Sequence, residues 1–161
     1  MIRRSRPARR RGAVAVESAV VYPVLLLILF GIIIGGMGVF RYQMTACLAR
    51  EASRYASVRG ADWQRDNFKA SPTEAEIVRD VVTPMAVSMD PKRLTVRVEC
   101  VNGVTGQVMS WDASRKAATT LNAKKEPVAN RVRTTVTYRW TPELFLRSTD
   151  LRSTSETPMS Y

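Results

Sequence analysis

The sequence predicts an α+β protein in which a long N-terminal transmembrane and stalk helix leads into a small head built on an antiparallel sheet. Three observations predict this fold. Residues 18–40 form an unbroken uncharged run rich in Val, Leu and Ile. An apolar stripe at helical spacing follows it, and two later segments alternate between apolar and polar residues, as half-buried strands do.

The length of the chain limits the number of domains, and its charge is concentrated at one end. The 161 residues suffice for one small domain with accessories. The formal net charge is +11, and six arginines fall within the first eleven residues. Without residues 1–12, the chain holds 19 basic and 14 acidic residues, a net charge of +5. About half of the basicity therefore belongs to an N-terminal leader.

The residue types that are absent exclude several chemistries. The chain has no histidine, so it cannot supply a Ser-His-Asp triad, a Cys-His pair or a His-containing zinc site. Its two cysteines cannot form a four-ligand metal cage. We therefore expect a protein that is not an enzyme, with no cofactor, no metal and no small-molecule substrate.

The uncharged run has the length of a membrane span. Its 23 residues, Ser18–Phe40, would form a helix of roughly 34 Å, against a bilayer core of about 30 Å. The six leader arginines favour a cytoplasmic N-terminus by the positive-inside rule. This predicts a single-pass membrane protein with an extracytoplasmic head. A buried core helix is the disfavoured alternative.

Three kinds of targeting signal compete for this segment. A cleaved secretory signal has a shorter apolar stretch and small residues at the cut, whereas this run is long and ends at Arg41. A lipoprotein signal would use Cys47, but Arg41 separates that cysteine from the run. The third signal is cut before the run, and the junction at Gly12 favours it.

The junction places a glycine after the arginines and a lone glutamate five residues later. This junction resembles the class III signal of type IV pilins and pseudopilins, and the resemblance implies a cut between Gly12 and Ala13. Such a cut would create a cationic α-amino group. That amine could pair with Glu17 of a neighbouring subunit, since an ionisable group at a span usually needs a partner. Glycine also lets a protease approach extended backbone. The alternative is a simple anchor in which Glu17 is only interfacial and Gly12 only ends the leader.

Two more features concern the helix itself. Gly31 and Gly35 form a G-x-x-x-G pattern, which lets helices approach closely in membranes and is also common by chance in glycine-rich spans. Beyond the span, Phe40, Met44, Leu48, Ala52 and Tyr55 recur at three-to-four spacing. This predicts one helix from about Ala13 to Arg59, with Gly60 as its stop.

Four stretches of the first 60 residues carry a family resemblance: R-G-A-V-A-V-E at 11–17, P-V-L-L-L at 23–27, Y-Q at 42–43, and A-R-E-A-S-R-Y-A at 49–56. Together they resemble the TadE-like family. The resemblance implies a minor pseudopilin of the tight-adherence (Tad/Flp) pilus, a type IVc system, with a type IV pilin-like fold. It also implies a place in the bacterial inner membrane, a class III signal cut after Gly12 by a prepilin peptidase, and partners among pilins and other pilus assembly proteins.

The head is predicted from its own local patterns. Ser71, Pro72 and Glu74 have the spacing of a helix start, followed by an apolar face that ends near residues 84–88. Strands are expected over residues 94–100 and 132–140, with a third over 151–157. Between them, residues 101–130 are expected to be rich in turns, with a short helix around 112–121.

Three groups in the head have two interpretations each. Cys47 and Cys100 either form a disulfide, which an extracytoplasmic site permits, or stay separate thiols. The basic residues Lys92, Arg93, Arg97, Arg133 and Arg139 either attract anionic polymers or form a solvated sheet face, which is favoured. Trp63, Trp111 and Trp140 either form a binding surface or pack in the core or at the membrane, which is favoured.

These observations predict three segments: a leader at 1–12, a transmembrane and stalk helix at 13–60, and a head at 61–161. The leading hypothesis is a processed pseudopilin-like membrane protein that also self-associates through its N-terminal helix. The alternative is an uncleaved anchor whose head binds a partner in a secretion complex. A nucleic-acid binder is disfavoured because the arginines adjoin a span, and a hydrolase because no nucleophile motif is recognisable.

Overall fold

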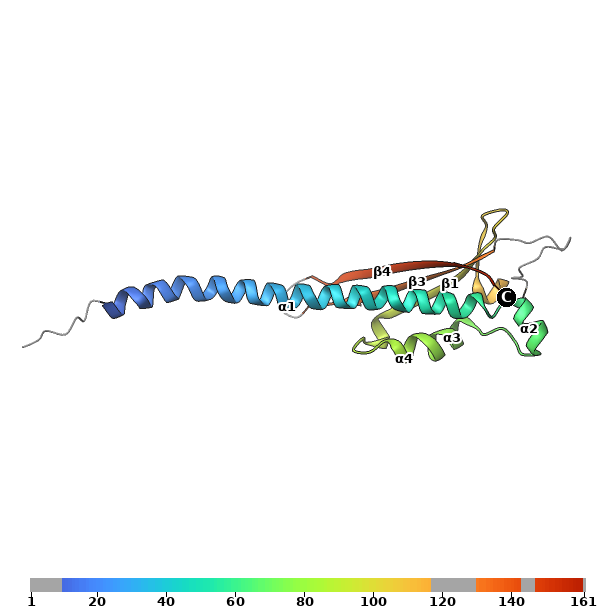
Figure 1. Ribbon diagram of the computed structural model, residues 1–161, viewed down its shortest axis with the longest axis horizontal. Coiled ribbons are helices and arrows are strands. Elements are labelled where there is room, and N and C mark those ends of the chain that lie inside the picture. The colour runs from blue at the N-terminus through green and yellow to red at the C-terminus, as the bar shows by residue number, and fades with distance from the viewer. Residues whose placement is uncertain (1–9, 117–129, 143–146, 161) are drawn as a thin grey trace, which may run out of the picture. The chain divides into compact units, whose positions relative to one another are not determined.

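The computed structural model describes residues 10–116, 130–142 and 147–160 (Figure 1). The helical elements are α1 (Arg10–Ser57), α2 (Ala61–Asn67), α3 (Glu74–Ile77), η1 (Val78–Val82), α4 (Thr83–Met85), η2 (Pro91–Arg93) and α5 (Trp111–Ser114). The strands are β1 (Leu94–Val101), β2 (Val108–Ser110), β3 (Arg131–Trp140) and β4 (Thr149–Pro158). The fold is α+β, with a long apolar helix followed by an antiparallel sheet, as the sequence predicts.

The chain divides into two compact units, residues 1–37 and residues 38–161. The described part of the first unit is helix throughout. The second unit, here called the head unit, contains the rest of α1 together with all the strands. The division into segments 1–12, 13–60 and 61–161 remains a prediction.

The sheet has the strand order β2-β1-β3-β4, with every neighbouring pair antiparallel. In register, Leu94 of β1 lies opposite Tyr138 of β3, and Trp140 of β3 lies opposite Thr149 of β4. The three predicted strands are confirmed, and β4 is longer than expected. The short strand β2 was not predicted, because its three residues are all exposed and show no alternation.

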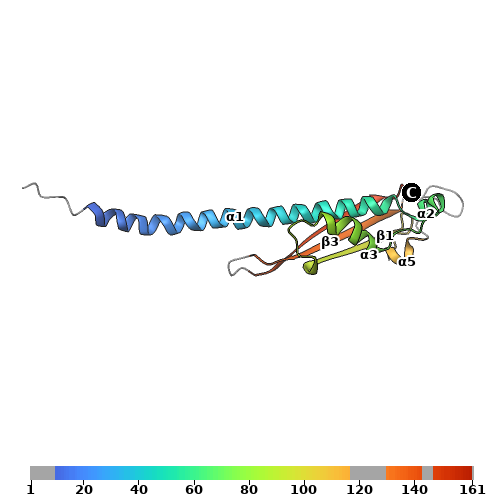
Figure 2. The same cartoon turned by 90° about the horizontal axis from the view of Figure 1, so that it is seen from below.

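One face of the sheet packs on the C-terminal part of α1 (Figures 1 and 2). The alternation in β3 buries every second side chain, including Val132, Thr134 and Val136, at 0% exposure. On α1, Leu48 and Ala52 are equally buried, which confirms part of the predicted stripe, whereas Phe40 is exposed. The core therefore lies between one face of α1 and one face of the sheet, and Ile77, Val82 and Trp111 of the shorter helical elements also belong to it.

The contact between α1 and β4 is made by hydroxyl groups. Ser53 is fully buried, and its Oγ lies 3.0 Å from Ser155 Oγ and 2.9 Å from Thr157 Oγ1. Small side chains let the strand approach the helix closely, and the shared hydrogen bonds satisfy groups that would be costly to bury alone. The sequence pattern missed this part of the interface because it contains few apolar residues.

The helix that follows α2 begins two residues later than predicted. Its N-cap is Thr73, which forms a capping box with Glu76, so the expected cap at Ser71 is wrong. The Ser71 hydroxyl instead donates to the carbonyl oxygen of Gly60 at 2.9 Å. The helix then passes through the π-helical η1 before α4. Pro84 in α4 has no N–H to donate, which accounts for the irregular turn.

The end of α1 also differs from the prediction. The helix ends at Ser57, and Gly60 is the N-cap of α2 with φ of −79° and not a left-handed helix stop. A second expected helix, around residues 112–121, is observed as α5 at Trp111–Ser114. Residues 117–121 of that prediction lie outside the described residues.

Candidate processing junction and membrane span

The N-terminal part of α1 has the length and composition to cross a membrane. Its apolar side chains are exposed along the whole stretch, with Leu27 at 74% and Ile32 at 71%. Contiguous apolar surface of this extent is rare on soluble proteins and needs an apolar surrounding. The helix therefore indicates a single-pass membrane anchor.

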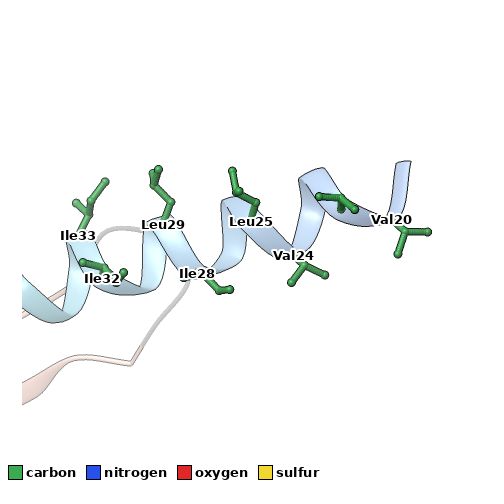
Figure 3. Close-up of a pocket in the computed structure, with 8 residues that line it drawn as sticks. Val20, Val24, Leu25, Ile28, Leu29, Ile32 and Ile33 are labelled. Carbon is green, nitrogen blue, oxygen red and sulfur yellow. The ribbon is translucent and has the colours of Figure 1, made fainter. Parts of the chain in front are cut away.

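One face of this helix carries a double row of aliphatic side chains (Figure 3). The residues that line the face are Val20, Val21, Val24, Leu25, Ile28, Leu29, Ile32 and Ile33. Their spacing of four residues keeps both rows on one side of the helix. Branched side chains on such a face suit both lipid tails and a second helix.

The glycine pair lies within the same stretch but does not line that face. A methyl group added at Gly31 or at Gly35 would meet no atom within 4 Å. Both positions therefore have open space beside them, as the predicted close approach of another helix requires. Their role in helix packing stays a prediction.

The predicted cleavage junction lies in the first turns of α1. Gly12 is exposed and helical, and a methyl group added to its Cα would meet no atom within 4 Å. A protease that needs extended backbone would have to open this turn. Glycine weakens a helix by about 1 kcal/mol relative to alanine, so the turn that contains Gly12 is easier to open.

Glu17 is exposed at the N-terminal end of the span. No ion pair joins it to any side chain among those described. The neighbouring Ser18 hydroxyl donates to the carbonyl oxygen of Val14 at 2.8 Å, which satisfies it within the helix. The carboxylate thus projects from a stretch of α1, Gly12 to Phe40, in which every other residue is uncharged.

Both cysteines are free thiols in the structure. Cys100 is buried, and burial raises the pKa of its thiol, while a hydrogen bond with Ser114 acts in the opposite direction. Cys47 lies half-buried on α1. Of the two interpretations from the sequence, the structure contains the separate thiols.

The head unit shows where the predicted basic and aromatic residues lie. Arg133 pairs with Glu156 across the β3–β4 ladder at 2.5 Å. Trp111 is fully buried, and its Nε1 donates to the carbonyl oxygen of Pro72 at 2.8 Å. Trp140 is half-buried against Gly38. Within the described ranges, no group of three or more His, Cys, Asp or Glu residues could hold a metal ion.

The structure also reveals a contact that the sequence analysis missed. The Arg41 guanidinium donates to the carbonyl oxygen of Ser88 at 2.7 Å and to the Tyr138 hydroxyl at 3.3 Å. It also lies 5.6 Å from the centre of the Tyr138 ring. Arg41 is the first charge after the uncharged run, and that position was the only signal in the sequence. Arg41 therefore ties α1 to the end of β3.

Comparison with known proteins gives one positive finding. Residues 12–54 match the family model described as TadE-like protein. This match confirms the resemblance found in the sequence and covers the junction, the span and the first turns of α1 within the head unit. Neither the curated proteins nor the solved structures that were compared include a match to this chain.

Proposed function

We propose, from the TadE-like character of residues 12–54, that this chain is a pseudopilin-like membrane protein that supports assembly of a Tad/Flp pilus or a related secretion system. A prepilin peptidase removes the leader after Gly12. The mature chain then begins at Ala13, stays in the inner membrane by its single span and associates with pilins and other assembly proteins. The chain itself performs no catalytic step.

The observation that carries the proposal is the order of features along α1. In the sequence an arginine-rich leader comes first, and along α1 it is followed by an exposed helical glycine, an exposed carboxylate and a long apolar face. After cleavage, the new amine on Ala13 supplies a cation near Glu17 of an adjacent subunit. Pairing the two charges removes the cost of a lone carboxylate at the membrane and fixes the axial register between helices.

The same features support the proposed orientation. Six arginines precede the span, whereas the four that follow it within twenty residues are Arg41, Arg50, Arg54 and Arg59. Arg41 is held against β3 and is not part of a dense cluster. The denser positive charge lies before the span, so the leader stays in the cytoplasm and the head is exported.

The second candidate function is an uncleaved anchor whose head binds a partner in a secretion complex. The helical state of Gly12 favours it, because a peptidase must first open that turn. The two candidates differ in one measurable property, the N-terminal residue of the protein in the membrane.

The test is mass spectrometry of the intact protein extracted from membranes of cells that contain a prepilin peptidase. We expect a mature N-terminus at Ala13. The Gly12→Ala variant should keep its leader, because the added methyl group obstructs the peptidase and strengthens the helical turn. The matched control is Gly35→Ala, which makes the same change within the span and should be cut normally.

Glu17→Gln provides a second arm of the test. This variant should be cut like the wild type but should lose co-purification with its partner subunits, because the amide cannot form the ion pair. A wild-type protein that keeps the arginine leader while supporting assembly refutes processing and leaves the uncleaved anchor. A Glu17→Gln variant that assembles normally refutes the charge pairing.

A further inference from the structure

A pocket in the head unit brings together basic and hydroxyl side chains. The residues that line it are Lys92, Arg93, Thr95, Arg139, Thr141 and Ser148. They come from η2, from the start of β1, from the end of β3 and from the segment before β4. Among the described residues, none that lines the pocket carries a carboxylate. Three cations and three hydroxyl groups in one concavity are the donor set that phosphate esters prefer.

The pocket lies at one particular end of the sheet. Leu94, which follows η2, is paired with Tyr138, and Arg139 comes directly after it. Tyr138 also contacts Arg41 of α1, and the ring of Trp140 contacts the backbone at Gly38. The pocket is therefore at the end of the head unit where its part of α1 begins.

That end of the head unit coincides with the end of the membrane span. The uncharged run finishes at Phe40, and Gly38 belongs to it. A run of roughly 34 Å fills a bilayer core of about 30 Å, so residues 38–42 fall in the headgroup layer. The exposed Phe40 and Tyr42 and the half-buried Trp140 provide the aromatic residues typical of this layer.

We propose that the pocket binds the headgroups of anionic phospholipids in the membrane that α1 spans, and so holds the head against the bilayer surface. The inference rests on the span and not on cleavage or on the pilus role. A basic residue close to an anionic membrane surface strengthens binding roughly fivefold. The three cations of the pocket act together, and the span keeps them close to the surface of the membrane.

The acidic residues nearby leave these cations available. Asp90 lies 3.6 Å from Arg93, but both side chains are almost half exposed, so the pair is well screened. Asp150 lies opposite Arg139 in the ladder, and the structure shows no ion pair between these two described residues. By contrast, Arg133 is engaged by Glu156 further along the sheet, away from the pocket.

The experiment places the full-length protein in nanodiscs of phosphatidylcholine, with or without phosphatidylglycerol as half of the lipid. Acetylation by an amine-reactive reagent is followed at Lys92 and, as an internal reference, at the exposed Lys69. We expect acetylation of Lys92 to slow at least about threefold in the anionic discs, because the bound headgroup shields the amine. The rate at Lys69 should not change.

A paired set of variants separates the pocket from a general surface effect. Arg93→Gln/Arg139→Gln should abolish the protection of Lys92. Arg50→Gln/Arg54→Gln removes two exposed arginines from α1 and should keep the protection. Equal rates at Lys92 in both lipids, or protection that survives the pocket double variant, refute the inference.

Two other results are also decisive. If inorganic phosphate protects Lys92 in neutral discs as well as the anionic lipid does, the pocket is a small-anion site and membrane docking is refuted. If the protein does not co-migrate with the discs, the span itself is refuted and this inference with it. Neither result depends on whether the leader has been removed, so the proposed processing is judged separately.

Discussion

At the scale of single residues, the head unit depends on hydrogen bonds that sequence patterns do not reveal. Glu74 is the clearest case: its Oε2 accepts from the backbone N–H of Val98 at 3.0 Å, and its own N–H donates to Asp112 at 2.9 Å. The carboxylate thus provides a hydrogen-bond partner for the Val98 N–H, which lies on the part of β1 that is not paired with β2. Two carboxylates therefore act here: Glu74 accepts from the sheet edge, and Asp112 accepts from the backbone N–H of Glu74 at the start of α3.

The capping box at the start of α3 gives a prediction for stability. Thr73→Ala removes the hydroxyl that accepts from the Glu76 N–H, so we expect the head to lose about 1 kcal/mol of unfolding free energy. Thermal unfolding of the detergent-extracted protein measures it. Thr83→Ala is the comparison variant: it removes an exposed hydroxyl of the same helical segment that donates to the Val78 carbonyl oxygen and caps no backbone N–H. An equal loss in both variants would contradict a specific capping role.

The same cap gives a pH dependence. Hydrogen bonds from the backbone N–H and then the hydroxyl of Thr73 lower the pKa of Glu76 below its ordinary value of 4.5. A lowered folded-state pKa stabilises the head above the ordinary value, and this contribution is lost as pH falls through the lowered value. Glu76→Gln should therefore flatten the acid-side loss of melting temperature between pH 5 and 3, as scans at each pH will show. An unchanged slope would exclude Glu76 as a contributor.

The two thiols should differ in reactivity. Cys100 is buried with a raised thiol pKa, so little of the reactive thiolate is present, whereas Cys47 is half-buried. We expect iodoacetamide to modify Cys47 first and Cys100 only after unfolding, as peptide mass spectrometry would show. If both cysteines resist modification until a reductant is added, the protein contains the Cys47–Cys100 disulfide.

At the scale of elements, α1 has two parts with different surfaces, one with exposed apolar side chains and one with a buried face. Up to Met37, its described side chains are nearly all exposed and apolar, as lipid-facing residues are. From Thr45 to Ser57, one face is buried among small residues and Leu48. A continuous helix can do both because its backbone hydrogen bonds are satisfied internally in either surrounding.

This division within α1 predicts different costs for the same substitution. Leu48→Ala leaves a cavity in the head core and should lower its unfolding free energy by about 2–5 kcal/mol. Leu29→Ala changes the exposed apolar part of the helix and should leave the unfolding of the head unaffected. Near-ultraviolet circular dichroism during chemical denaturation follows the head in both variants. Matching losses would show that the two parts of the helix do not differ in this way.

At the scale of the whole molecule, charge at the ends of the span governs orientation. The leader arginines are more numerous and more densely spaced than the basic residues that closely follow Phe40. Orientation by this rule depends on positive charge and not on the guanidinium group. The charge of the leader can therefore be changed by substitution without any change in the head, which makes orientation testable.

The corresponding prediction uses a reporter enzyme that is active only outside the cytoplasm, fused after Tyr161. Replacing the six leader arginines with glutamine should lower reporter activity, because a share of the molecules inserts in the opposite direction. Replacing them with lysine should preserve activity, since the charge is kept. Equal activity in all three proteins would refute orientation by the leader.

Local periodicity and composition were enough to predict several parts of this protein before its structure was known. The length of the span, the leader, the strands over residues 94–100 and 132–140 and the TadE-like segment were all readable, because an uncharged run, a charge cluster and a period of two are properties of neighbouring residues. Gly12, Ala13 and Glu17 were located in the same way, because an arginine cluster ends at the glycine and a lone acid precedes the uncharged run.

Contacts and pockets formed by residues distant in the chain could be found only in the folded protein, because no local pattern encodes them. Examples are the hydroxyl contacts of Ser53, the hydrogen bond from Arg41 to Tyr138 and the basic pocket of the head unit. They join residues as far apart in the chain as Arg93 and Arg139 (46 positions) and Ser53 and Ser155 (102 positions). The helix start at Thr73 was misplaced for a related reason. Ser71 has the residue type and spacing of an N-cap, but its hydroxyl donates to the carbonyl oxygen of Gly60. Thr73 is therefore the N-cap of α3.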